Sequence, residues 1–251
     1  MLKTLIAGIR TFVFVPMFFM LTLIYSSFII LFGIFRPTSP LHGRIVKRWS
    51  RTFLRIPPVK FSVEGLEHVD PNTRYVVVSN HVSTYDIPLL LWLLPIEGRF
   101  LAKKELFRIP LVSTAMRRVG IIEVNREAGG SSRVAINEGV KLAAERGYSL
   151  IVFPEGTRSD ATELLPFKKG AFRIAIDTGL PLLPVIIEGS DRISRPGSKL
   201  FFPGSARIRI LPAVETVGLT NRDDLTPLMR STEQAITSEY AELHGTSPHQ
   251  S

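Results

Sequence analysis

The sequence of 251 residues predicts an α/β domain in which a mixed, largely parallel sheet is covered by helices, with a membrane-associated helical module at the N-terminus. Two observations predict the domain: short apolar, β-branched runs alternate with segments of helical periodicity, and turn residues separate them. A third predicts the module, because a long uncharged apolar run and a basic amphipathic segment precede the strands. The length is sufficient for one such domain with its own core.

The predicted strands and helices alternate from residue 75 onward. Strands are predicted where apolar runs are short and rich in Val and Ile, at residues 75–78, 120–124, 150–153, 182–187 and 206–211. Helices are predicted where apolar residues recur with helical spacing, at residues 87–94, 131–146, 171–178 and 226–243. Such alternation favours a sheet with helices on its faces.

Residues 11–35 form an uncharged run rich in Phe, Leu, Ile and Val. As a helix, these 25 residues would extend about 37 Å, enough to cross a hydrocarbon layer of about 30 Å. Pro16 and the polar residues 25–27 interrupt the run, so a helix that enters one leaflet without crossing stays open. A cleaved signal peptide is the alternative, but the run is too long and has no small-residue cleavage pattern.

Residues 41–56 have the pattern of a basic amphipathic helix. Its apolar positions recur every four residues: Leu41, Ile45, Trp49 and Phe53. Basic side chains occupy the rest of its surface: Arg44, Lys47, Arg48, Arg51 and Arg55. A helix of this kind can lie among lipid headgroups, or it can pack on the domain with its basic face in water.

Composition places the excess positive charge beside the apolar run. The net charge is +9, and residues 1–63 contain nine Lys or Arg and no acidic residue, whereas the remainder is balanced. This placement predicts an anionic membrane lipid as partner and no nucleic acid. If the run crosses, the heavier charge after Phe35 predicts that the C-terminal domain lies on the cytoplasmic side. The absence of cysteine excludes disulfides, thiolate metal sites and a cysteine nucleophile.

We therefore divide the chain into three parts: a membrane-binding helical module at residues 1–57, an α/β domain at 58–244 and a disordered tail at 245–251. Pro57 and Pro58 end the module, and the tail is polar.

The first chemical motif directly follows the strand at 75–78. It reads Asn-His-Val-Ser-Thr-Tyr-Asp, from Asn80 to Asp86, and leads into a helix. Ligands commonly bind at the carboxyl ends of strands in open α/β sheets. Across a turn, Asp86 can fold back onto one ring nitrogen of His81, which leaves the other nitrogen free to take a proton from a hydroxyl. Alternatively, Asp86 caps the helix and His81 is an ordinary loop residue.

The second motif, Phe-Pro-Glu-Gly-Thr-Arg-Ser at residues 153–159, directly follows the strand at 150–153. Its Pro and Gly indicate a turn, and Gly156 allows a ligand to approach the backbone. Arg158 offers a planar fork for phosphate, with the Thr157 hydroxyl beside it. Alternatively, this is a surface loop in which Glu155 neutralises Arg158. The motifs of serine hydrolases, P-loop proteins, dinucleotide-binding proteins and zincins are absent from the sequence.

Together the two motifs, N-H-x4-D and F-P-E-G-T-R-S, resemble those of glycerolipid acyltransferases of the lysophosphatidic acid acyltransferase type. They occur in the family's order, about 70 residues apart. Three further stretches resemble the family, at residues 102–106, 120–126 and 183–187, and the resemblance covers roughly residues 40–215. Arg126 follows Glu-Val-Asn, where the family often has an aromatic residue and an Asp.

The resemblance implies a reaction and a role for each matching residue. Its acyl donor is a thioester, acyl-CoA or acyl carrier protein, and its acceptor is the free hydroxyl of lysophosphatidic acid, which becomes phosphatidic acid. The implied catalytic residues are His81 as general base, Asp86 as its partner and Gly156, near which backbone amides stabilise the oxyanion. The implied substrate-binding residues are Lys103, Arg126, Glu155, Thr157 and Arg158. No metal or redox cofactor is required.

Two alternatives stay open. The same chemistry can act on another acceptor, such as another lysophospholipid, glycerol phosphate or a lyso-aminolipid. A membrane-surface binding protein without catalysis would explain the apolar run and the charge placement, but not the two motifs at two strand ends.

Overall fold

The structure, a computed structural model, describes residues 2–36, 39–55, 59–125, 136–137, 139–143, 145–159, 164–195, 197–198 and 200–245. Its helices are α1 (Leu2–Phe35), α2 (Leu41–Leu54), α3 (Asp86–Leu93), α4 (Val112–Val119), α6 (Gly170–Thr178), α7 (Ser190–Ile193) and α8 (Leu225–Gly245), with short 3-10 turns η1 (Leu66–His68) and η2 (Lys104–Arg108). Its strands are β1 (Val59–Glu64), β2 (Val76–Ser79), β3 (Gly98–Lys103), β4 (Ile122–Val124), β5 (Ser149–Val152), β6 (Leu182–Glu188) and β7 (Gly204–Ile210).

The strands within the described residues form one seven-stranded sheet in the order β1-β7-β6-β2-β5-β3-β4. β6 and β7 are antiparallel, and the other neighbouring pairs are parallel. The predicted mixed, largely parallel sheet is therefore confirmed. The carboxyl ends of β2, β3, β4, β5 and β6 all lie at one edge, where loops from different parts of the chain can meet.

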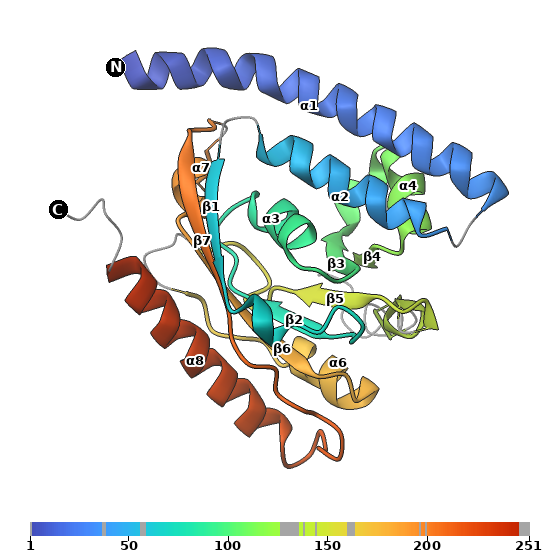
Figure 1. The fold of residues 1–251 in the computed structure, drawn as a ribbon, viewed down its shortest axis with the longest axis vertical. Helices are drawn as coiled ribbons and strands as arrows, with labels where there is room; N and C mark the ends of the chain where they lie inside the picture. Colours follow the sequence, from blue (N-terminus) through green and yellow to red (C-terminus); the bar gives the residue numbers. More distant parts are fainter. Residues whose placement is uncertain are drawn as a thin grey trace.

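Helices cover both faces of the sheet (Figure 1). One apolar cluster lies between the sheet and α2 and α3, and a second lies between the sheet and α6 and α8. β2 and β6 are buried along their whole length, which explains why both read as continuous apolar runs in the sequence.

Most predicted elements agree with the structure to within a few residues, and the differences have local causes. The strand predicted at 120–124 begins at Ile122, because Gly120 adopts a left-handed conformation that ends α4. β1, an edge strand that is mostly exposed, was not predicted. β3 was not predicted either, since its second residue is Arg99, a buried charge. Residues 136–137, 139–143 and 145 are helical, as predicted, whereas the rest of the helix predicted at 131–146 and the tail at 246–251 lie outside the described residues.

The N-terminal helix α1 is continuous, with Pro16 inside it. Within it, Ile6–Phe35 is long and apolar enough to cross a membrane. One face of α1 packs on α2, where Phe14 and Phe18 contact Phe53, and its later turns pack on α4. The opposite face exposes apolar side chains to the surroundings. The helix lies outermost over α2 in Figure 1, and this exposed apolar face indicates membrane association.

Candidate active site

The loop after β2 brings His81 and Asp86 together. Nδ1 of His81 lies 2.8 Å from Oδ2 of Asp86. The imidazole stacks on the ring of Phe153, which follows β5, with 4.1 Å between centroids. The His81 side chain is 14% exposed and Asp86 is fully buried. Among the described residues Nε2 of His81 has no hydrogen-bond partner, so this nitrogen can accept a proton from a bound molecule.

The Asp86 carboxylate supports the loop that precedes it. Its Oδ2 atom also accepts hydrogen bonds from the amides of Val82 and Ser83, each at 2.8 Å. These amides lie before α3, so the carboxylate folds back onto the loop and does not cap the helix amides. The hydroxyl of Ser190, at the start of α7, donates to Oδ1 at 2.5 Å. Asp86 is therefore held in one orientation relative to His81 by partners on both of its oxygens.

Glu155 joins the two motifs. Its Oε1 atom accepts a hydrogen bond from the amide of His81 at 2.7 Å, and its Oε2 atom accepts one from the amide of Leu165 at 2.9 Å. The residue is 2% exposed. Burial raises the pKa of the Glu155 carboxyl, and these hydrogen bonds act in the opposite direction. Each carboxylate oxygen accepts a hydrogen bond from a backbone amide, so Glu155 supports the His81 loop, and among the described residues it forms no ion pair with Arg158. Its predicted contact with substrate stays a prediction.

Gly156 forms the turn after β5. Its φ is +75°, and an added Cβ would lie 2.6 Å from Nζ of Lys168. Its own amide donates to the carbonyl of Phe153 at 3.0 Å, so the predicted oxyanion donors near Gly156 do not include this amide. The amides of Thr157 and Arg158 have no hydrogen-bond partner within the described part of the chain and can serve instead.

The remaining predicted residues gather at the same edge of the sheet. Thr157 and Arg158 are exposed on the loop after β5, and the adjacent strand β3 ends at Lys103, also exposed. Lys103 pairs in register with Val124, the last residue of β4. Arg126 lies outside the described residues. Basic residues thus follow two neighbouring strands, β3 and β5, at the edge of the sheet where the His81 loop also lies, an arrangement that suits a phosphate-bearing ligand.

Three supporting residues were not predicted from the sequence. The side chain of Asn80 bonds both the amide and the carbonyl of Ile187 at 2.8 Å, which ties the His81 loop to β6. Ser190 holds Asp86, and Lys168 adds a cation beside Gly156. Asn80 belongs to the first motif, and Lys168 stands before another Lys and a Gly, so their positions could have been singled out. Nothing in the sequence indicated that Ser190 contacts Asp86, because the two residues are 104 positions apart.

Comparison with known proteins finds similarity to acyltransferases. A family model described as acyltransferase matches residues 60–188. A 1-acyl-sn-glycerol-3-phosphate acyltransferase alpha from Mus musculus is 30% identical over 227 residues, which cover 87% of this chain and 79% of the relative. A 1-acyl-sn-glycerol-3-phosphate acyltransferase from Limnanthes douglasii is 35% identical over 159 residues, or 63% of this chain and 55% of the relative. The crystal structure of a 1-acyl-sn-glycerophosphate (LPA) acyltransferase, PlsC, from Thermotoga maritima matches with a TM-score of 0.78 and 27% identity, covering 97% of this chain and 99% of that chain.

Proposed function

Because the chain belongs to the acyltransferase family, we propose that it transfers a fatty acyl group from a thioester donor, acyl-CoA or acyl carrier protein, to the free hydroxyl of lysophosphatidic acid, giving phosphatidic acid. The relatives named for 1-acyl-sn-glycerol-3-phosphate support this acceptor. The observation that carries the chemistry is the His81–Asp86 pair, with one imidazole nitrogen on the carboxylate and the other without a hydrogen-bond partner among the residues that the structure describes.

In this mechanism Nε2 of His81 accepts the proton of the acceptor hydroxyl while the hydroxyl oxygen attacks the thioester carbonyl. Asp86 orients the imidazole and stabilises the imidazolium that forms. The amides of Thr157 and Arg158 donate to the oxyanion in this mechanism. When the tetrahedral intermediate collapses, the C–S bond breaks and the sulfur takes the proton from His81 as the thiol leaves. The balance of this reaction requires no metal or redox cofactor.

The acceptor phosphate binds among the cations at the carboxyl edge of the sheet. Arg158 and Lys103 are both exposed there, and Lys168 lies beside Gly156 in the same loop region. Thr157 adds a hydroxyl, and Arg126, predicted as a further phosphate ligand, follows β4 in the sequence. Holding the phosphate fixes the acceptor hydroxyl near His81, which lowers the entropic cost of the reaction.

The packing of α1 supports a helix that enters one leaflet and does not cross the bilayer. Near its start, Thr11 accepts a hydrogen bond from the amide of Phe201 at 3.0 Å. Near its end, Ile29 packs on Ala115 and Val119 of α4. These two contacts are about 27 Å apart along the helix. A helix held to the domain at both points lies along the domain surface, with its exposed apolar face toward lipid.

The basic residues of α2 support the cytoplasmic side. Arg44, Arg48 and Arg51 are exposed on the helix beneath α1. The cytoplasmic leaflet carries anionic lipids, so a basic helix at the membrane surface is attracted to that leaflet. The catalytic domain then faces the cytoplasm, and anionic lipid is a partner of the module.

The test is acyl transfer by the purified full chain in detergent, with lysophosphatidic acid and acyl-CoA or acyl carrier protein. His81→Ala is expected to lower turnover by about 10²–10⁴-fold, the usual contribution of a general base. The matched control is His68→Ala, in η1, which is expected to keep the parent rate. Turnover by His81→Ala near the parent value would exclude the proposed base.

The acceptor assignment has its own test. Arg158→Lys keeps the charge but loses the planar fork, so the KM for lysophosphatidic acid is expected to rise. The uncharged acceptor monoacylglycerol serves as the matched substrate, and its kinetics are expected to change little. An equal effect on both acceptors, or an effect on the donor alone, would contradict phosphate binding by Arg158.

A further inference from the structure

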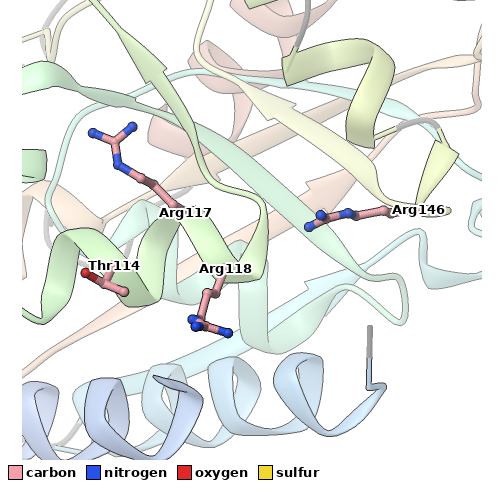
Figure 2. Close-up of a pocket in the computed structure, with 4 residues that line it drawn as sticks. All are labelled: Thr114, Arg117, Arg118 and Arg146. Atoms are coloured by element: carbon pink, nitrogen blue, oxygen red, sulfur yellow. The ribbon is translucent and has the colours of Figure 1, made fainter. Parts of the chain in front are cut away.

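A second basic site lies away from the catalytic edge. Thr114, Arg117 and Arg118 of α4 and Arg146, which precedes β5, line an open hollow of about 380 Å³. Figure 2 shows Arg146 reaching toward α4 and Arg118 directed toward the N-terminal helices. The hollow is therefore lined by three arginines from two separate segments.

Two of these arginines are not neutralised. Arg117 pairs with Glu123 at 2.7 Å and lies over the ring of Phe107. Arg118 and Arg146 have no ion pair with any described residue. Thr114 adds an exposed hydroxyl to the same hollow. Two unpaired guanidinium groups and a hydroxyl suit an oxyanion such as a phosphate.

A buried histidine lies close to the same arginines. His42, in α2, is 1% exposed, and among the described residues its Nε2 atom has no hydrogen-bond partner. Burial lowers the pKa of His42, and the charges of Arg99, Arg118 and Arg146 lower the pKa further. The neutral imidazole is therefore favoured, and it adds no positive charge of its own to the hollow.

The hollow borders the exposed apolar end of α1. The Arg118 side chain lies against Gly33 of α1, where an added Cβ would be 2.7 Å from its Nη1 atom. The neighbouring residues Leu31, Ile34 and Phe35 are exposed, Phe35 by 78%. The cationic hollow and the exposed apolar side chains within two residues of Gly33 along α1 together match the two halves of an amphiphile with an anionic head.

This hollow is separate from the catalytic edge. Arg99, at the start of β3, donates a hydrogen bond from Nε to the carbonyl of Val119, at the end of α4. Lys103, at the end of β3, lies at the catalytic edge. These two positions are four residue steps apart along the strand, or about 13 Å. A molecule in the hollow therefore does not occupy the position of the acceptor beside His81.

We propose that the hollow between α4 and Arg146 binds the phosphate of an anionic membrane phospholipid, whose acyl chains lie along the exposed end of α1. Arg118 and Arg146 bind the phosphate oxygens, and Thr114 donates its hydroxyl. A free phosphate could use the same donors, but it would not use the apolar surface of Leu31, Ile34 and Phe35. The bound lipid would hold α1 and α4 at the membrane surface.

The test counts the lipid molecules retained by the full chain in neutral detergent, by native mass spectrometry. Phosphatidylglycerol is titrated in one arm, phosphatidylcholine with the same acyl chains in a second, and inorganic phosphate is added as a competitor in a third. The parent protein is expected to retain phosphatidylglycerol in preference to phosphatidylcholine. None of the substitutions lies at the catalytic edge, so lipid bound there is the same for all variants. A difference in retention between variants therefore reports on the hollow.

The variant Arg118→Gln/Arg146→Gln is expected to retain at least tenfold less phosphatidylglycerol than the parent, because each arginine removed is expected to weaken binding roughly fivefold. The charge-matched control Arg222→Gln/Arg230→Gln removes two exposed arginines at and just before α8, on the other face of the sheet, and is expected to retain nearly as much as the parent. Arg146→Gln alone alters one exposed side chain, so it also reports on binding if the double variant is unstable. If the Arg118→Gln/Arg146→Gln variant and the control variant retain equal amounts of phosphatidylglycerol, the proposed site is wrong. Full displacement by inorganic phosphate would overturn the lipid assignment. Because only binding is measured, the result is independent of the proposed catalysis.

Discussion

The hydroxyl of Ser190 lies 2.5 Å from Oδ1 of Asp86, while Oδ2 of the same carboxylate lies 2.8 Å from Nδ1 of His81. Ser190 begins α7, directly after β6, so a second strand end fixes the carboxylate that orients the imidazole. Ser190 is thus a positioning residue, because it acts on His81 only through Asp86.

Ser190→Ala is expected to lower kcat about tenfold or more with little change in KM, since a hydrogen bond to a charged group contributes about 1.5–3 kcal/mol. Steady-state acyl transfer measures both constants. Ser190→Thr keeps a hydroxyl and is expected to restore much of the rate. The matched control is Ser194→Ala, whose hydroxyl bonds Thr84 and does not contact Asp86. A rise in KM alone would argue against the positioning role.

Gly156→Ala is expected to weaken acceptor binding. A side chain at φ +75° is strained by about 1–2 kcal/mol, and the new Cβ would displace Lys168 from beside the turn. The KM for lysophosphatidic acid is therefore expected to rise. Gly170→Ala, at the start of α6, is the control, because no atom lies within 4 Å of its added Cβ. Equal kinetics for the two variants would mean that the turn tolerates a side chain.

Glu155→Gln is expected to lower both the melting temperature and turnover. The carboxylate accepts from two backbone amides, whereas the Gln side chain presents one oxygen and one NH₂ group. One buried amide, of His81 or Leu165, then faces a donor, at a cost of about 1–3 kcal/mol. Thermal unfolding and acyl transfer measure the two effects. An unchanged melting temperature would show that the two loops do not depend on this link.

The stability of the protein is expected to fall in mild acid because of His42. The pKa of His42 is lowered in the folded state, chiefly by burial and then by Arg99, so below its ordinary value of 6.5 the unfolded chain binds more protons than the folded chain. Stability is therefore highest above that pH and decreases as the pH falls toward the lowered pKa. Melting temperatures at about pH 7.5 and about pH 5.5 are expected to differ more for the parent than for His42→Gln. An equal difference would exclude His42 as the cause.

Several features of the fold followed from the sequence because their causes are local. Buried parallel strands read as short apolar runs, and the amphipathic spacing of residues 41–56 gives α2, which ends at Leu54. β1 and β3 escaped this reasoning, since β1 is exposed at the sheet edge and β3 contains the buried Arg99. A strand is recognised from its run of apolar residues, so a strand whose buried positions are not all apolar is missed.

The sequence by itself determined the two motifs, the likeness of their spacing to an acyltransferase and the concentration of positive charge before residue 64. Only the tertiary structure decided that Asp86 holds its own loop, that Glu155 supports His81, and that α1 lies against α4. The same holds for Ser190 on Asp86 and for Arg146 opposite Arg118. The physical reason is that motifs are contiguous in the chain, whereas these contacts join residues brought together by strand order and helix packing, which local periodicity does not encode.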